Sequence, residues 1–231
     1  MKTIGLIGGM SWESTIPYYR AINEGVKQQL GGLHSARCIL YSVDFHDIER
    51  LQHAGDWNAA GAMLADAARS LELAGADFIV LCTNTMHKVA GSIEAAVSIP
   101  LLHIADATAM AVKQAGFSRV GLLGTKFTME QPFYREYLND QYGIEVLLPN
   151  DAERDSLHQI IYQELCQGII NPESKQTVRR MMAGLAWQGV DAIILGCTEI
   201  GLLVGKADAA VPLFDTTLLH AEAAVDRALK G

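Results

Sequence analysis

Residues 189–199 read GVDAIILGCTE, an apolar run that stops at a glycine and is followed at once by a cysteine and two polar residues. The run Val190–Leu195 predicts a buried strand, because strands that are covered on both faces are apolar throughout. In an open parallel sheet, ligands bind outside the carboxyl ends of the strands. We therefore expect the thiol of Cys197 to face a ligand rather than the core.

The same pattern occurs earlier in the chain. Residues 75–85 read GADFIVLCTNT and align without a gap with residues 189–199, at an offset of 114 residues, so that Thr83 is the counterpart of Cys197. Residues 4–10, 16–20 and 99–102 repeat as residues 120–126, 131–135 and 211–214, at offsets of 116, 115 and 112. These offsets predict an internal duplication whose halves meet near residues 116–118. The period is too long for a solenoid, so we expect two similar domains.

Predicted strands alternate with predicted helices in both halves. This alternation is typical of the α/β class and predicts two pseudo-symmetric, doubly wound parallel-sheet domains with the active site between them. We place the N-terminal domain at residues 1–116 and the C-terminal domain at residues 117–231, and expect the last helix, 218–229, to pack back onto the N-terminal domain. No linker rich in Pro, Gly or Ser separates the halves, which predicts that they pack tightly.

The composition excludes several classes of protein. Half of the 231 residues are apolar and 19% are charged, as in ordinary soluble α/β proteins. A net charge of −8 argues against nucleic-acid binding, which requires a basic surface. No apolar run approaches the roughly 18 residues of a membrane-spanning helix. Four cysteines without a Cys-x-x-Cys pair indicate reduced thiols and a cytoplasmic protein.

The four cysteines differ in context. Free cysteines usually fill cores, and this is our interpretation of Cys38 and Cys166. Cys82 precedes Thr83 on a predicted strand, so its side chain points away from that of Thr83 and is also expected in the core. Cys197 has polar neighbours and a predicted helix N-terminus just beyond it, which we expect to expose the thiol and lower its pKa.

Two other motifs lie near predicted strand ends. The turn at Gly8-Gly9 follows a predicted strand and precedes a helix capped by Ser11, which allows three interpretations: a phosphate cradle, a tight turn, or backbone N–H groups aimed at a substrate carboxylate. The third glycine of a dinucleotide fingerprint is missing, which disfavours the first. Asp44, His46 and Asp47 do not have the spacing of a known metal site, so no metal is predicted.

At this point the motifs resemble those of a known family. Residues 8–11 (GGMS), 83–87 (TNTMH) and 196–199 (GCTE) resemble the aspartate/glutamate racemases over essentially the whole chain, and within that family the enterobacterial members specific for L-aspartate and L-glutamate. The resemblance implies an isomerase that needs no pyridoxal phosphate or other cofactor. It also implies two catalytic cysteines, one from each domain, that exchange the α-proton on opposite faces of the amino acid.

The chain departs from that pattern at one catalytic position. Cys197 resembles the cysteine of the second domain, the base for L-substrates, but Thr83 stands where most relatives have the other cysteine. A threonine hydroxyl cannot replace a thiolate as a base, so we expect the L-enantiomers to be favoured. Relatives hold the substrate's side-chain carboxylate with a basic residue, and the matching position here is Gln52, with Arg50 nearby.

The resemblance also implies a substrate-binding set. Thr83, Asn84, Thr85, Thr198 and the backbone amides near Met10 and Thr125 would bind carboxylates, and Glu199 would bind the ammonium group. His87 is interpreted as a structural neighbour of this set. The expected partner is a small amino acid, with no nucleic acid and no membrane, and relatives commonly form homodimers.

Two alternatives remain open at the level of the sequence. One is a one-cysteine relative such as an arylmalonate-type decarboxylase or a maleate-type isomerase, which also needs few bases and an anion hole. The other is a non-catalytic amino-acid-binding protein in which Cys197 has no chemical role.

Overall fold

The computed structural model of the chain describes residues 1–230 and divides into two compact units. The first unit comprises Met1–His103 together with the stretch that begins at His220, and the second comprises Ile104–Leu219. The chain therefore leaves the first unit once and returns to it through its last helix.

The first unit is built on a four-stranded parallel sheet with the order β2-β1-β3-β4. Its strands are β1 (Ile4–Gly8), β2 (Cys38–Ser42), β3 (Phe78–Leu81) and β4 (Leu101–Leu102). Its helices are α1 (Trp12–Leu30), α2 (Phe45–Ala54), α3 (Trp57–Leu73), the 3-10 helix η1 (Thr85–Val89), α4 (Ala90–Glu94) and most of α11 (Thr216–Lys230).

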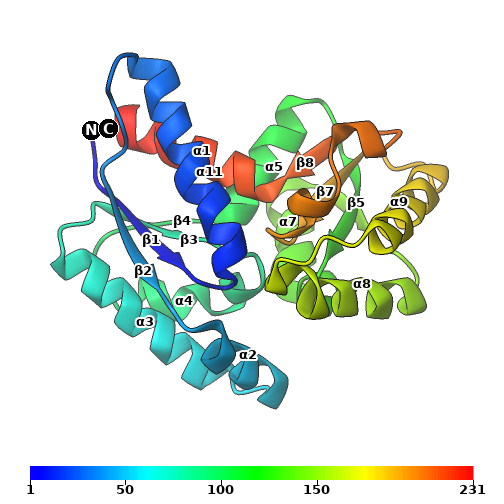
Figure 1. Ribbon diagram of the computed structural model, residues 1–231, viewed down its shortest axis with the longest axis horizontal. Helices are drawn as coiled ribbons and strands as arrows, with labels where there is room; N and C mark the ends of the chain where they lie inside the picture. Colours follow the sequence, from blue (N-terminus) through cyan, green and yellow to red (C-terminus); the bar gives the residue numbers. More distant parts are fainter. Residues whose placement is uncertain (231) are drawn as a thin grey trace. The chain divides into compact units, whose positions relative to one another are not determined.

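Helices cover both faces of this sheet. On one face, α1 and α11 lie next to each other (Figure 1), and their buried side chains form one cluster with Phe78, Val80 and Cys82 of the sheet. On the other face, α3 packs on Ile79 and Leu81. Because alternate residues of a strand point to opposite faces, this arrangement directs Cys82 into the α1 and α11 side, as predicted. The last helix, from His220 onward, belongs to the first unit and packs on this face of its sheet.

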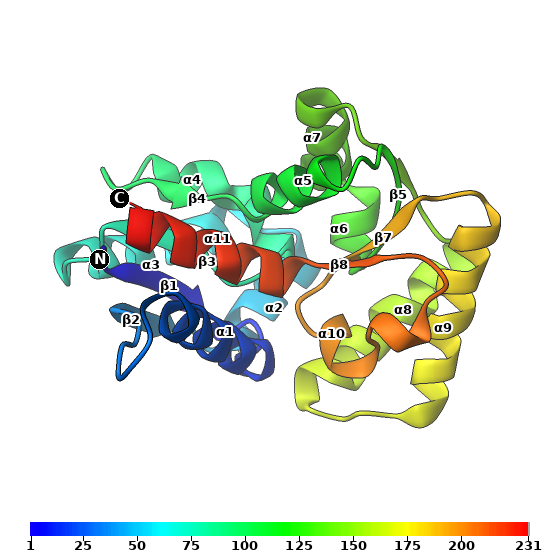
Figure 2. The ribbon, with the colours of Figure 1, turned by 90° about the horizontal axis from the view of Figure 1, so that it is seen from above.

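The second unit repeats the architecture, with a parallel sheet in the order β6-β5-β7-β8. Its strands are β5 (Arg119–Gly124), β6 (Glu145–Leu147), β7 (Ala192–Gly196) and β8 (Leu213–Asp215). Figure 2 shows α5 to α7 on one side of these strands and α8 to α10 on the other. The helices are α5 (Ile104–Gln114), α6 (Lys126–Glu130), α7 (Pro132–Tyr142), α8 (Asp151–Gln163), η2 (Leu165–Gln167), α9 (Pro172–Trp187), α10 (Ile200–Leu203) and η3 (Lys206–Asp208).

The strand register confirms the internal duplication. In the first unit Ile4 pairs with Phe78, and in the second Val120 pairs with Ala192, which are the positions given by the offsets 116 and 114. Likewise, the pair Ile79 and Leu101 corresponds to the pair Ile193 and Leu213. The two doubly wound parallel sheets predicted from the sequence are therefore present, with identical strand orders.

The strand order also locates the ligand-binding edge of each sheet. From β1 the chain winds outward to β2 and then returns to β3 on the other side of β1, so the winding reverses between β1 and β3. Such a reversal opens a crevice at the carboxyl ends of the two strands. The same reversal occurs between β5 and β7 in the second unit.

The division between the units differs from the predicted boundary at residue 116. It lies at His103 and Ile104, so that α5 belongs to the second unit, where it contacts α7 and β8. The carboxylate of Asp106 fixes this contact, because its Oδ1 accepts hydrogen bonds from the hydroxyls of Tyr137 at 2.6 Å and Tyr142 at 2.7 Å. Strand β4, which precedes this division, is short, because the chain becomes helical at Ile104.

None of the helices in residues 1–230 combines the length and the apolar composition that a membrane-spanning helix needs.

We predict that replacing Asp106 by alanine destabilises the protein by about 2 kcal/mol, because two hydroxyl groups lose a charged acceptor. The loss is measured as the change in the free energy of unfolding in urea. Asp140→Ala on the exposed side of α7 is the control, and we expect it to change stability by less than about 0.5 kcal/mol. Equal effects of the two substitutions would contradict the role given to Asp106.

Candidate active site

The first unit gathers buried polar groups at the carboxyl ends of two neighbouring strands. β1 and β3 pair in parallel, so the residues that follow them emerge at the same edge of the sheet. Met10 follows β1, and Thr83, Asn84 and Thr85 follow β3. All four are at most 7% exposed. Polar side chains that are buried at a strand end fit a site for a polar ligand better than a core.

The backbone of Thr83 is held on both sides. Its N–H donates to the carbonyl of Leu81 at 2.8 Å, in a tight turn around Cys82. Its carbonyl lies 2.7 Å from Nδ1 of His87, one helical turn further along η1. These two contacts fix the position from which the Thr83 side chain projects.

The Gly8-Gly9 turn forms a tight connection between β1 and α1. Gly9 has a φ of +93°, and a Cβ there would collide with the carbonyl oxygen of Val43. The Gly9 N–H donates to Oγ1 of Thr15 at 2.9 Å, so this amide is directed at α1. The tight-turn interpretation therefore accounts for both glycines, and the backbone amides near Met10 stay the predicted carboxylate donors of this segment.

Gln52 and Arg50 lie on the same helix but in different environments. The structure places both on α2, where Gln52 is 3% exposed and Arg50 is exposed. The side-chain amide of Gln52 donates to the sulfur of Met86 at 3.0 Å, which brings Gln52 beside η1 and the segment that starts at Thr85. Between these two residues of α2, Gln52 is thus the one that lies beside the strand-end groups.

The second unit has an equivalent set of strand-end residues. β5 and β7 pair up to Gly124 and Gly196, and Thr125 and Cys197 are the next residues of the two strands. Oγ1 of Thr125 accepts from the backbone N–H of Thr128 at 3.2 Å, and thereby caps α6. Thr125, Cys197, Thr198 and Glu199 are all at most 7% exposed.

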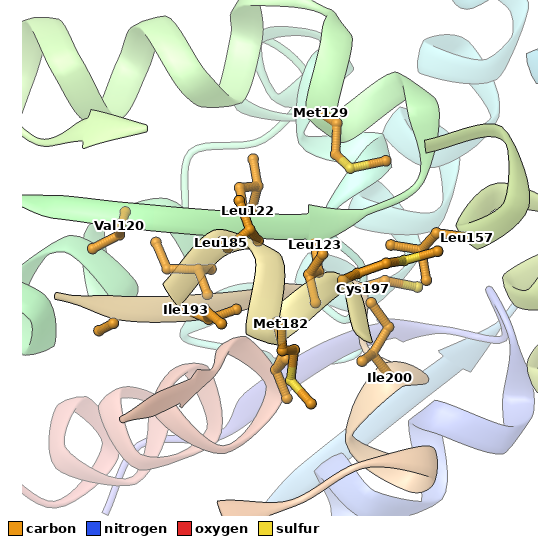
Figure 3. Close-up of a cluster of buried hydrophobic side chains, with 14 of the residues drawn as sticks. Val120, Leu122, Leu123, Met129, Leu157, Met182, Leu185, Ile193, Cys197 and Ile200 are labelled. Carbon is orange, nitrogen blue, oxygen red and sulfur yellow. The ribbon is translucent and has the colours of Figure 1, made fainter. Parts of the chain in front are cut away.

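Cys197 is bonded to a buried carboxylate. Figure 3 shows its side chain beside Leu123, Leu157 and Ile200, at the end of the apolar cluster of the second unit. Its sulfur donates to Oε2 of Glu199 at 3.0 Å, and the hydroxyl of Thr198 donates to the same oxygen at 2.9 Å. A thiol, a hydroxyl and a carboxylate from three consecutive residues therefore form one hydrogen-bonded group.

The expectation of an exposed, acidic thiol was wrong. Cys197 is only 7% exposed, and its pKa lies well above its usual value. Burial is the main cause, because it disfavours the thiolate, and the neighbouring Glu199 carboxylate adds to it through repulsion and through the hydrogen bond to the thiol. The helix beyond, α10, has only four residues, and its N-terminus does not outweigh these effects.

The side chains of the other three cysteines pack in apolar surroundings, and of these Cys166 lies close enough to Cys197 to add to the rise in its pKa. Cys82 is fully buried among the side chains of α1 and α11, and burial raises its pKa. Cys38 is half-buried on β2, and burial raises its pKa to about 11. Cys166 is half-buried in η2 and packs against the core of the second unit. These positions agree with the expectation that the three thiols fill space.

The acidic and histidine residues near β2 have a structural explanation. Oδ1 of Asp44 accepts from the backbone N–H of His46 at 3.0 Å, and Asp44 is the N-cap of α2. Within residues 1–230 no three His, Cys, Asp or Glu side chains are arranged to hold a metal ion.

Two contacts of the strand-end groups were not predicted from the sequence. Glu199, which the resemblance assigns to a substrate ammonium group, accepts hydrogen bonds from the thiol of Cys197 and the hydroxyl of Thr198. His87, interpreted only as a structural neighbour, bonds to the carbonyl of Thr83. The spacing of Cys197 and Glu199 was a signal for the contact between them, because a carboxylate two residues after a cysteine in a turn can reach its sulfur. No comparable signal predicted that His87 would bond to a backbone carbonyl.

Comparison with known proteins decides the family. Residues 7–224 match the profile of the Asp/Glu/Hydantoin racemase family. The chain belongs to this family. The resemblance inferred from the GGMS, TNTMH and GCTE motifs is thereby confirmed, and the protein is an enzyme of the isomerase class.

Relatives span a range of identities. A crystal structure of a candidate Asp/Glu racemase from Yersinia pestis is 62% identical, with a TM-score of 0.91 and coverage of 99% of this chain and 100% of that one. An aspartate racemase homologue from Pyrococcus horikoshii is 34% identical, with a TM-score of 0.84 and coverage of 99% of both chains. The broad specificity amino-acid racemase RacX of Bacillus subtilis is 26% identical over 230 residues, 96% of both chains.

We predict that Glu199→Gln lowers the pKa of the Cys197 thiol, because the repulsive charge and the carboxylate acceptor are removed while burial is retained. Iodoacetamide should therefore modify Cys197 faster in this variant than in the wild type at about pH 8, since the thiolate is the reactive form. The rate is followed for each cysteine by peptide mass spectrometry.

Cys38 is the internal control, because it lies in the other unit and its rate should not change. Equal rates for Cys197 in the two proteins would show that the carboxylate does not hold the thiol proton.

Proposed function

We propose that the protein racemises aspartate and glutamate without pyridoxal phosphate, and that Cys197 removes the α-proton of the L-enantiomers. The observation that carries this proposal is the buried thiol of Cys197, placed at the end of a central strand and bonded to Glu199 at 3.0 Å. The names of the relatives support the substrate class, since two of them are described by aspartate or by Asp/Glu.

The proposed reaction begins with the thiol proton. Glu199 accepts the proton from Cys197, and the thiolate then takes the α-proton of the L-amino acid, leaving the electron pair on the substrate carbon. The thiol is restored in this step, and the carbanion is neutralised when a proton returns to either face of that carbon. Return of a solvent-derived proton to the original face, after the thiol has exchanged its hydrogen with water, exchanges the α-hydrogen, and return of a proton to the opposite face inverts the configuration.

Substrate binding is assigned to the buried strand-end groups. Thr83, Asn84, Thr85 and Thr198, with the backbone amides near Met10 and Thr125, hold the carboxylates. These neutral donors stabilise negative charge that develops on the α-carboxylate without themselves changing protonation. Gln52 holds the side-chain carboxylate, and the Glu199 carboxylate holds the ammonium group.

A Schiff base at Lys126 is disfavoured by the surroundings of this lysine. Lys126 follows Thr125 and forms an ion pair with Asp155 at 2.5 Å, and the hydrogen bond to Asp155 raises its pKa. A protonated amine does not attack a carbonyl, so Lys126 is poorly suited to form a Schiff base.

The two enantiomers are treated differently in this proposal. The D-enantiomer presents its α-hydrogen to the Thr83 side, where the hydroxyl cannot accept it. Protons reach that face through water, so inversion of the L-substrate is slower than exchange of its α-hydrogen.

We further propose that the enzyme is cytoplasmic, because a catalytic thiol needs a reducing compartment. We also propose that it forms a homodimer and that its only other partner is a small amino-acid substrate.

The rival assignments are a decarboxylase or maleate-type isomerase, and a non-catalytic amino-acid-binding protein. Incubation with L-aspartate in heavy water separates them: a racemase incorporates deuterium at the α-carbon, a decarboxylase releases carbon dioxide only from a diacid of its own, and a binding protein does neither.

We predict that Cys197→Ser lowers α-hydrogen exchange of L-aspartate and L-glutamate by at least about 10²–10⁴-fold, the usual contribution of a general base. A serine hydroxyl at this position is a far weaker base than a thiolate. Exchange is followed by proton NMR in heavy water, and the fold of the variant is checked by circular dichroism.

Cys38→Ala and Cys166→Ala are the controls and should lose little exchange activity. Cys38 lies on β2 of the first unit, and Cys166, although it adds to the rise in the pKa of Cys197, packs against the core of the second unit. A loss of exchange activity in either control as large as that in Cys197→Ser would show that Cys197 is the wrong thiol. Retained exchange in folded Cys197→Ser would remove Cys197 from the mechanism.

We also predict that Thr83→Cys creates or strongly raises α-hydrogen exchange of D-aspartate and D-glutamate, since a second base can contribute roughly 10²–10⁴-fold. The measurement is exchange of both enantiomers by NMR in the wild type and in Thr83→Cys. The wild type should exchange L-substrates readily and D-substrates poorly. Equal rates for the two enantiomers in the wild type would contradict the asymmetry and leave Thr83 as a carboxylate ligand.

A further inference from the structure

The duplication places two equivalent carbonyl groups at the strand ends, and they are bonded in different ways. The carbonyl of Cys197 accepts from the backbone N–H of Ile200 at 3.1 Å, within its own turn. The carbonyl of its counterpart Thr83 accepts from a side chain, Nδ1 of His87, at 2.7 Å. A carbonyl can only accept, so Nδ1 of His87 carries the hydrogen.

The second unit has no room for a side chain at the position of His87. The offset of 114 makes Gly201 its counterpart, and a Cβ there would lie 2.5 Å from the carboxylate of Asp215. Asp215 is in turn the counterpart of His103, at the offset of 112 that relates β4 to β8. The pair Gly201 and Asp215 is thus replaced in the first unit by two histidines, whose ring centroids lie 4.5 Å apart.

His87 is held in place by its neighbours. It is 4% exposed, and a third histidine, His220 of α11, lies with its ring centroid 6.0 Å away. Nε2 of His220 donates to the carbonyl of Leu102 at 2.9 Å, which leaves Nδ1 to accept from the hydroxyl of Tyr18 at 3.0 Å. Burial, together with His103 and His220, holds the pKa of His87 well below its usual value, so its ring stays neutral.

We propose that His87 is a positioning residue: by donating from Nδ1 to the Thr83 carbonyl, it fixes the face of the site that Thr83, Asn84 and Thr85 form. The proposal rests on the proposed function for its consequence in catalysis. Cys197 has its own backbone hydrogen bond, so a change at His87 should affect the Thr83 face alone. The duplicated chain therefore supplies an internal reference for the effect.

The kinetic test uses Thr83→Cys as the background, because exchange of D-aspartate then reports the group at position 83 and exchange of L-aspartate reports Cys197. Adding His87→Phe, which keeps an aromatic ring but has no donor, should lower D-exchange about five-fold or more, the value of one hydrogen bond, and leave L-exchange within about two-fold. Adding His87→Asn, whose amide nitrogen occupies the place of Nδ1, should retain D-exchange. Tyr18→Phe is the control within the histidine cluster and should change neither rate.

A loss of L- and D-exchange to the same extent in a folded His87→Phe protein, or no loss of D-exchange, would overturn the proposal. A second measurement is independent of activity. Nitrogen NMR of the full-length wild type should show His87 as the neutral Nδ1–H tautomer at about pH 7, below which a free histidine becomes charged. The Nε2–H tautomer or a charged ring would overturn the proposal, whereas absence of α-hydrogen exchange in the wild type would overturn the proposed function and leave this readout to decide on His87.

Discussion

The reversal of winding between the two middle strands of each sheet is the constraint on which the site depends. Because β1 pairs with β3 and β5 with β7, the segments after these strands must emerge side by side at one edge. In sheets with such a reversal, the crevice at the carboxyl ends of these strands is the usual place for a ligand. Every residue assigned to substrate except Gln52 lies in one of these four segments. The chemistry can therefore change by single substitutions while the sheets stay the same.

The two halves illustrate this separation of fold and chemistry. Their strand registers coincide, yet the equivalent positions 83 and 197 carry a hydroxyl and a thiol, and each has a different support. The thiol is bonded to a carboxylate two residues later, and the backbone of the threonine is bonded to an imidazole four residues later. A neutral imidazole suits a residue that only needs to be held, whereas a carboxylate can also accept a proton.

Much of the fold could be predicted because it is encoded locally. Apolar runs that end at glycine or threonine gave β3 and β7, and the repeat offsets gave the matching registers. The place of α5 could not be predicted in this way, because it depends on Asp106 meeting Tyr137 and Tyr142, which lie more than thirty residues further on. The burial of Cys197 was missed for the same reason, since Leu157, which packs beside it, comes from a distant helix.

The raised pKa of Cys197 is compatible with its proposed role and makes Glu199 necessary to it. The α-proton of an amino acid is weakly acidic, and by the Brønsted relation a thiolate of higher pKa, once it is formed, removes it faster. An exposed thiol of low pKa would be ionised more often but would be a weaker base. Burial therefore makes the Cys197 thiolate a stronger base but lowers the fraction of the thiol that is ionised. The reaction then also requires a nearby group that can take the thiol proton when substrate is bound. Glu199, 2% exposed and 3.0 Å from the sulfur, is the group that meets this requirement within the second unit.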